Sequence, residues 1–315
     1  MIPEKTAFLF PGQGSQLVGM GKNLAEIAPA ARQVFEAADD FLGFSLSQLA
    51  WEGPEDELND TINTQPALLV HSTAVYQVFQ SRYPGFRPAF VAGHSMGELS
   101  ALVASGALPY LDALGLVRRR GELMKSAGKT SPGGMAAILG LDIPTLESIC
   151  AQASADAGPQ ESVQVANDNC PGQVVISGAT QALQQALELA SAAGARRAVA
   201  LAVSIAAHSP LMVHAQQDFN QAVEQALIQD PHTPLVGNVT AAPLSNAEAI
   251  RQDLRAQLSS RVRWTESIQF MLANGVDTFI EIGPGSVLCG LLKRIDRQAK
   301  GYPLGNPEDF DRLED

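Results

Sequence analysis

The chain has 315 residues, of which 46% are hydrophobic and 17% are charged, and its net charge is −12. A chain of this length and composition can bury a large core, so disorder is excluded, and the acidic excess argues against nucleic-acid binding. No apolar run approaches the roughly 18 residues of a membrane span. The start, MIPEKTAFLFPG, is a poor signal peptide because an acid precedes its short apolar run. Cys150, Cys170 and Cys289 form no C-x-x-C pair, which favours a reducing cytoplasm.

The predicted elements alternate between strands and helices over residues 1–130. In chain order they are a strand at 6–10 followed by PGQGSQ, helices near 30–42 and 66–81, a strand from 89, a helix after Ser95, and a helix near 110–127. This alternation predicts a mainly parallel sheet with helices on its faces.

A different order follows in the middle of the chain. GMAAILGL predicts a strand, 144–157 a helix, SVQVAN and QVVISG two strands joined by DNCPG, 180–193 a helix, and RRAVALAV a last strand. The order βαββαβ is the split ferredoxin-like unit, which can close as a small domain. We therefore expect a ferredoxin-like subdomain over 131–201, inserted into a large catalytic domain built from 1–130 and 202–315.

The α/β alternation resumes after this insertion. We expect helices at 210–228, 246–258, 264–274 and 286–296, and strands at PLVGN and DTFIEIG. The tail GYPLGNPEDFDRLED is acidic, and we expect it to be loosely attached.

The stretch GHSMG, at 93–97, lies at a predicted strand-to-helix turn. One interpretation is a nucleophile elbow, in which Ser95 has a strained backbone and only glycine fits on either side. The other is an ordinary tight turn with a capping serine. With an elbow, the fold class is α/β: a large parallel-sheet domain like that of the α/β-hydrolases, with the small ferredoxin-like subdomain inserted.

Five histidines are candidate partners for the serine. His94 should point away from a substrate, His71 fits a packed helix residue, and His214 and His232 have no motif around them. His208 follows a predicted strand and precedes a helix, so its imidazole could project over the elbow, although a structural role is equally open. No two histidines have H-x-x-H or H-E-x-x-H spacing, so we expect no metal site.

Seven motifs together resemble the malonyl-CoA:acyl-carrier-protein acyltransferases of fatty acid synthesis. They occur in the family's order from about residue 6 to 310: FPGQGSQLVGMG, GHSMGELSA, RRRGELM, NDNCPGQVVISG, VSIAAHSPLM, VRWTESI and EIGPGSVLCGLLKRI. The resemblance implies transfer of a malonyl group from malonyl-CoA to the phosphopantetheine thiol of an acyl carrier protein. It implies no metal and no bound cofactor, and partners that include neither nucleic acid nor membrane.

The resemblance also implies roles for individual residues. Ser95 is the acyl-accepting nucleophile and His208 its general base, active as the neutral imidazole. Activity should therefore rise with pH through the pKa of this histidine, which is around 6.5 before perturbation. The backbone N–H groups of Gln13 and Met96 form the oxyanion hole. Arg120 pairs with the free carboxylate of malonyl through two parallel hydrogen bonds, which a lysine cannot copy.

Other residues have supporting or lesser roles. Gln257 resembles the residue whose backbone carbonyl orients the catalytic histidine, and Asn167 and Asn169 match an asparagine pair near the pocket. We expect Arg118 and Arg119 to be solvated charges. The family more often has other residues at three positions, which are Met96, Ala207 and Arg263 here. The first two line the acyl pocket and leave the preference between malonyl and methylmalonyl open.

Three alternatives stay open. A serine hydrolase could use Ser95, Asp168 and His208. A non-catalytic carrier-binding or scaffold subunit would not need Ser95, His208 and Arg120 together. Within the family, a malonate decarboxylase subunit or a polyketide acyltransferase uses the same chemistry. A carrier docking patch could include Arg196, Arg197, Lys293 and Arg294, although scattered surface charge explains these residues equally well.

Overall fold

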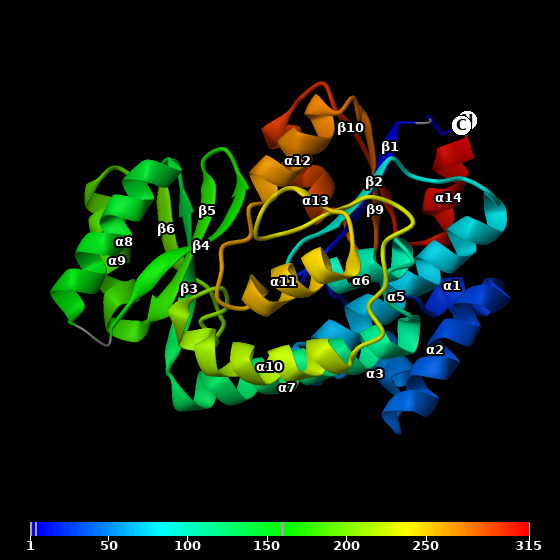
Figure 1. Cartoon of the computed structure of the whole chain (residues 1–315), viewed down its shortest axis with the longest axis horizontal. Coiled ribbons are helices and arrows are strands. Elements are labelled where there is room, and N and C mark those ends of the chain that lie inside the picture. Colours follow the sequence, from blue (N-terminus) through cyan, green and yellow to red (C-terminus); the bar gives the residue numbers. More distant parts are fainter. Residues whose placement is uncertain (1, 4, 159–160, 315) are drawn as a thin grey trace.

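The computed structural model describes residues 2–3, 5–158 and 161–314, so the outermost predicted domain ends, Met1 and Asp315, lie outside it. Two separate sheets organise the fold. Figure 1 shows the smaller sheet with helices α8 and α9 at one end of the molecule and the larger sheet at the other, with α7 and α10 running between the two parts.

The larger sheet has the strand order β10-β9-β1-β2-β7-β8, and all neighbours are parallel except β7 and β8. Its strands are β1 (Thr6–Phe10), β2 (Phe90–Gly93), β7 (Leu235–Val236), β8 (Pro243–Leu244), β9 (Thr278–Ile282) and β10 (Lys300–Leu304). Every residue of β1 is buried, because helices cover both faces of a parallel sheet. The alternating side chains of β1 enter different cores, Phe8 and Phe10 on one face and Ala7 and Leu9 on the other.

Helices of the larger part surround this sheet. They are α1 (Lys22–Ile27), α2 (Pro29–Leu42), α3 (Leu46–Glu52), α4 (Glu55–Leu58), α5 (Thr61–Arg82), α6 (Gly97–Ala104), α7 (Tyr110–Thr130), α10 (Val213–Gln225), α11 (Ala247–Gln257), α12 (Trp264–Ala273), α13 (Val287–Ile295) and α14 (Pro307–Glu314), with a 3₁₀ turn at Pro210–Met212. Within the described ranges, none of the helices combines the length and apolar character that crossing a bilayer needs.

The smaller sheet is antiparallel, with the order β4-β5-β3-β6. It contains β3 (Gly133–Leu139), β4 (Val163–Cys170), β5 (Gln173–Ala179) and β6 (Arg197–Ala200), and α8 (Ile143–Ala157) and α9 (Thr180–Ala192) complete it. This is the split βαββαβ arrangement that the sequence predicts. Strand β4 continues past the predicted end at Asn167, because irregular pairing with β5 carries it to Cys170.

The chain end differs from the prediction. Instead of a loose tail, β10 pairs with β9, and α14 buries Phe310 completely. The Arg82 guanidinium lies 4.7 Å from the centroid of the Phe310 ring. The expectation of loose attachment was wrong because burial of the Phe310 ring attaches the segment to the core, even though most residues around it are acidic and favour water.

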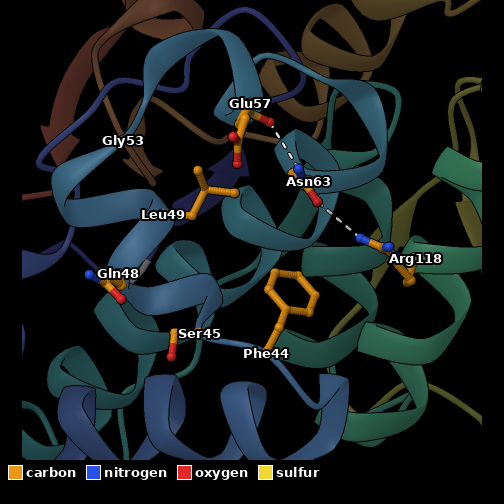
Figure 2. Close-up of a pocket in the computed structure, with 8 residues that line it drawn as sticks. All are labelled: Phe44, Ser45, Gln48, Leu49, Gly53, Glu57, Asn63 and Arg118. Atoms are coloured by element: carbon orange, nitrogen blue, oxygen red, sulfur yellow. Dashed lines mark hydrogen bonds between the residues drawn. The ribbon is translucent and has the colours of Figure 1, made fainter.

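Helix α5 begins five residues before the predicted start, at Thr61, with Pro66 inside it. Proline has no N–H, so the carbonyl of Ile62 lacks its usual helical donor. Arg118 of α7 supplies one, from Nη1 to Ile62 O at 2.9 Å, and also donates to Asn63 Oδ1 at 3.0 Å. Arg118 and Asn63 both line a surface hollow of about 400 Å³, and Figure 2 shows the Arg118 side chain pointing toward Asn63. Arg118 is therefore a helix-joining residue, not the solvated charge that the sequence suggests.

Candidate active site

Ser95 lies between β2 and α6 with a φ of 53°, a left-handed backbone that is rare for serine. A Cβ on Gly93 would lie 2.0 Å from the carbonyl of Gly97, and one on Gly97 would lie 2.2 Å from Phe10 O. Glycine is therefore required on both sides of the serine. The Ser95 side chain does not cap α6, so the turn has the geometry of an elbow and not of an ordinary capped turn.

The Ser95 hydroxyl contacts His208, whose Nε2 lies 2.7 Å from Oγ. On the other side of the ring, Nδ1 lies 2.8 Å from Gln257 O and 3.2 Å from Ser260 O. Backbone carbonyls only accept hydrogen bonds, so Nδ1 carries the proton and Nε2 is free to accept the serine proton.

His208 does not stand at a strand end as predicted. Strand β6 ends at Ala200, and the histidine lies in an irregular segment with a φ of 58°. Its backbone is held by N–H donation to Leu258 O at 2.8 Å and by Gln164 Nε2 donating to its carbonyl at 2.7 Å.

Burial, and secondly the Arg120 charge, lower the pKa of His208 to about 3. The ring is then neutral at physiological pH, as a general base requires. The predicted rise of activity through the histidine pKa therefore moves to well below pH 6.5.

Arg120 is 1% exposed on α7. Its Nη1 donates to Gln65 Oε1 at 2.7 Å, its Nη2 to Gln257 Oε1 at 3.0 Å and to Ser95 Oγ at 3.1 Å. Burial lowers its pKa to about 10, so it stays charged at neutral pH. All these partners are neutral, and in the described part of the chain no carboxylate forms a salt bridge with it. A buried cation with only neutral partners is suited to an anionic ligand.

The predicted oxyanion donors both line the cleft beside Ser95. Met96 follows the serine, and Gln13 lies in the loop after β1, the strand paired with β2. Across the residues that the structure describes, neither N–H donates a hydrogen bond to protein. Gln13 is anchored by its side chain, which accepts from Thr61 Oγ1 at 2.9 Å. Both N–H groups are thus available to a ligand, and their role stays a prediction.

The asparagine pair lies on β4, and both residues line the cleft. Asn169 Oδ1 lies 2.8 Å from His94 Nε2. Between this contact and the ring of buried Trp264, 5.4 Å away, the His94 ring is fixed in place. Its direction relative to a substrate stays a prediction.

Asp168, the alternative triad acid, does not reach His208. Its Oδ1 accepts from Thr265 Oγ1 at 2.7 Å, while His208 Nδ1 is bonded to the two backbone carbonyls. The Ser95-Asp168-His208 triad is therefore wrong.

The cleft has a volume of about 870 Å³ and lies between the two sheets. Ser95, Met96 and Arg120 come from the larger part, Met135 and Val175 from the smaller sheet. Its wall includes apolar side chains beside the buried cation. No cluster of side chains that could hold a metal ion occurs among residues 2–3, 5–158 and 161–314.

A family model described as acyl transferase domain matches residues 7–304. The chain belongs to this family. It is 47% identical over 304 residues to the malonyl CoA-acyl carrier protein transacylase of Bacillus subtilis (strain 168), covering 96% of this chain and 94% of the relative. It is 43% identical over 301 residues to the Escherichia coli (strain K12) protein of the same name, covering 96% of each.

Solved structures agree. An acyl carrier protein S-malonyltransferase from Vibrio cholerae superposes with a TM-score of 0.94 at 40% identity, covering 98% of this chain and 99% of that one. A type II PKS acyl-carrier protein in complex with its malonyl-transacylase gives a TM-score of 0.93 at 41% identity, covering 98% of each chain.

Three residues of this acyl transferase site were missed from sequence. Asn238 accepts from Ser95 N at 2.7 Å and donates to Gly93 O at 2.7 Å, so it clamps the elbow. Gln65 contacts Arg120, and Glu98 contacts Gln257. Only Glu98 had a sequence signal, as the one charge in the apolar helix GELSALVA.

Proposed function

We propose that this acyl transferase moves a malonyl group from malonyl-CoA to the phosphopantetheine thiol of an acyl carrier protein, through a malonyl ester on Ser95. The observation that carries the proposal is the position of Arg120 Nη2, 3.1 Å from the Ser95 hydroxyl oxygen. An acyl group attached there places a carboxylate one methylene beyond its carbonyl, within reach of the guanidinium. The fork of Arg120 can then bind both carboxylate oxygens.

The first half-reaction forms the ester. His208 Nε2 accepts the hydroxyl proton as Ser95 Oγ attacks the thioester carbonyl carbon. Charge developing on the carbonyl oxygen is stabilised by the N–H groups of Gln13 and Met96. The C–S bond then breaks, and the CoA sulfur leaves with the proton from Nε2. The carrier thiol reverses these steps and takes the malonyl group.

Nδ1 of His208 faces carbonyls instead of a carboxylate, so the imidazolium is weakly stabilised. A thiolate is a comparatively stable leaving group, and this exchange therefore needs less proton transfer than amide cleavage does. The site suits exchange between thiols.

The proposal needs no metal and no bound cofactor, because the chain supplies every group in these steps. Dialysis against a chelator should leave the rate of acylation unchanged. We place the reaction in a reducing cytoplasm, where the free, buried Cys150, Cys170 and Cys289 would stay unpaired. The proposed role is supply of malonyl units for fatty acid or polyketide synthesis.

Carrier docking is proposed at the end of the small sheet near Arg294. This residue donates to Gln173, which lines the cleft, and Lys293 precedes it on α13. Residue 173 pairs with Leu139, and Leu139 pairs with Arg197, so the predicted basic residues gather at one end of the sheet. Arg294→Glu should raise the KM for carrier while leaving acylation by malonyl-CoA intact.

Intact-mass measurement tests the main proposal. Mixing with malonyl-CoA should add one malonyl group to wild type, which should persist until a carrier protein is supplied. Ser95→Ala should gain no mass. Steady release of malonate without a carrier would identify a hydrolase instead, and carrier binding without acylation would identify a scaffold.

A further inference from the structure

Two carboxyl groups are buried directly behind the elbow. Glu98, on α6, is 0% exposed, and Asp253, on α11, is 3% exposed. Glu98 Oε2 accepts a hydrogen bond from Gln257 Nε2. Asp253 Oδ1 accepts from Val239 N at 3.2 Å, next to the elbow-clamping Asn238. The pair therefore joins α6, α11 and the loop after β7.

The two carboxyls lie close enough for each to influence the titration of the other. In the described part of the chain, Glu98 Oε1 and Asp253 Oδ2 are buried and have no hydrogen-bond partner. Two carboxylates cannot form a hydrogen bond without a proton between them. Burial, and then the charge of Asp253, raise the pKa of Glu98 well above its usual range. A proton on Glu98 would supply the donor that the two unpartnered oxygens lack.

Gln257 connects this pair to the reacting groups. Its Nε2 also donates to Ser95 O at 3.2 Å, its Oε1 accepts from Arg120, and its backbone carbonyl accepts from His208. An amide can be rotated so that its nitrogen and oxygen exchange places. In the rotated form, the NH₂ group would face the guanidinium, donor against donor. An acceptor at Glu98 Oε2 selects the orientation that suits Arg120.

We propose that Glu98 is a positioning residue that acts in its protonated form, donating to Asp253 while accepting from Gln257. It thereby fixes the side-chain amide of Gln257 and, through it, the guanidinium that receives the substrate carboxylate. The idea rests on the proposed function, since it assigns Glu98 a part in malonyl selection.

Three variants test it. In Glu98→Gln, the amide NH₂ can donate to Asp253 and the amide oxygen can accept from Gln257, so both bonds survive without a titratable group. Glu98→Met has similar size but forms neither bond. Glu281→Gln is the matched control, because Glu281 is also 0% exposed but accepts from Leu288 N at 3.0 Å and Cys289 N at 2.8 Å, away from Gln257.

We expect Glu98→Met to lower kcat/KM for malonyl-CoA by about 10- to 100-fold, the range found for lost outer hydrogen bonds at metal sites. It should also reduce the preference for malonyl-CoA over acetyl-CoA. Glu98→Gln should keep most of the wild-type kcat/KM for malonyl-CoA and most of the preference over acetyl-CoA. Glu281→Gln should lower stability without altering the malonyl preference. An infrared difference spectrum, wild type minus Glu98→Gln, should show the C=O stretch of a protonated carboxyl.

The proposal is overturned if Glu98→Gln is as damaging as Glu98→Met, since Glu98 would then act as a carboxylate. It is equally overturned if Glu98→Met behaves like wild type, or if the difference spectrum lacks the protonated-carboxyl band. Failure of wild type to accept malonyl would instead refute the proposed function. In that case the infrared band and the Gln257 side-chain amide resonance, expected to move in Glu98→Met but not in Glu98→Gln, still decide the role of Glu98.

Discussion

The Ser95 hydroxyl oxygen lies between a base and a cation, 2.7 Å from His208 Nε2 and 3.1 Å from Arg120 Nη2. The cation favours the developing alkoxide but disfavours an imidazolium beside it. These opposed effects control both pH dependence and specificity.

The first prediction concerns pH. Because the pKa of His208 is lowered to about 3, the base is already neutral well below pH 6.5. The rate of Ser95 acylation should therefore be nearly flat from about pH 5 to 8. Arg120→Ala removes one cause of the depression, so the pKa of His208 should rise and the acid limb should move to higher pH. Rapid-quench intact-mass measurement checks this. A wild-type rate that halves near pH 6.5 would show an unperturbed histidine.

The second prediction concerns Arg120 and the acyl group. Without the guanidinium, a malonyl carboxylate would be buried unpaired, so Arg120→Ala should cost about 2–5 kcal/mol in kcat/KM for malonyl-CoA. The acetyl group carries no charge, so kcat/KM for acetyl-CoA should fall much less. Arg120→Lys keeps the charge but not the planar fork, so its kcat/KM for malonyl-CoA should lie between those of wild type and Arg120→Ala. Equal proportional losses for malonyl-CoA and acetyl-CoA would make Arg120 a structural residue.

The sequence indicated the reacting groups and one residue that holds them, Gln257, whose backbone carbonyl contacts His208 as predicted. It did not indicate the others. Ser95 and Arg120 occur in motifs, since their chemistry restricts the residue type. Gln65 and Asn238 come from positions 55 and 143 residues away from their partners. Nothing local marks an amide whose partner is that distant in the chain.

At the scale of elements, the elbow is a close contact between backbones. The third prediction compares two glycines. Gly97→Ala places a Cβ 2.2 Å from Phe10 O and 2.8 Å from Pro11 O, so β1 and α6 must separate. We expect a loss of about 1–3 kcal/mol in the free energy of unfolding, and loss of acylation as the two oxyanion donors move apart.

Gly290→Ala is the control for this substitution. This exposed glycine lies inside α13 with nothing within 4 Å of an added Cβ, so alanine should stabilise by about 0.5–1 kcal/mol. Urea unfolding of both variants gives the comparison. If both variants changed the free energy of unfolding by the same amount, close backbone packing would not explain the elbow glycines.

Elements with strong apolar periodicity were predictable, including the whole βαββαβ unit. The short helices α1, α3 and α4 were not, because helices of four to seven residues are stabilised by tertiary packing and carry little periodic signal. Helix α14 was not predicted either, because Phe310 alone makes no periodic pattern.

At the scale of the whole molecule, His71 of α5, which does not line the cleft, affects stability. Burial lowers the pKa of His71 to about 4. Below about pH 6.5 the unfolded chain takes up a proton that the folded chain refuses, so the free energy of unfolding falls as pH falls. The slope is about 1.4 kcal/mol per pH unit down to about pH 4.

The fourth prediction follows from this linkage. His71→Met should flatten the acid side of the stability curve between about pH 6.5 and 4, relative to wild type. Urea unfolding across that range measures it. Parallel curves for the two proteins would mean that His71 is protonated in the native state.

Both reacting residues have left-handed backbones, with φ of 53° at Ser95 and 58° at His208. Each such conformation costs about 1–3 kcal/mol, which glycine at either position would largely avoid. A lineage released from the need for catalysis would gain stability by placing glycine at these two positions. Selection for turnover and selection for thermal robustness therefore oppose each other at this pair, and thermostabilising evolution of this enzyme must be carried out under a continuous demand for activity.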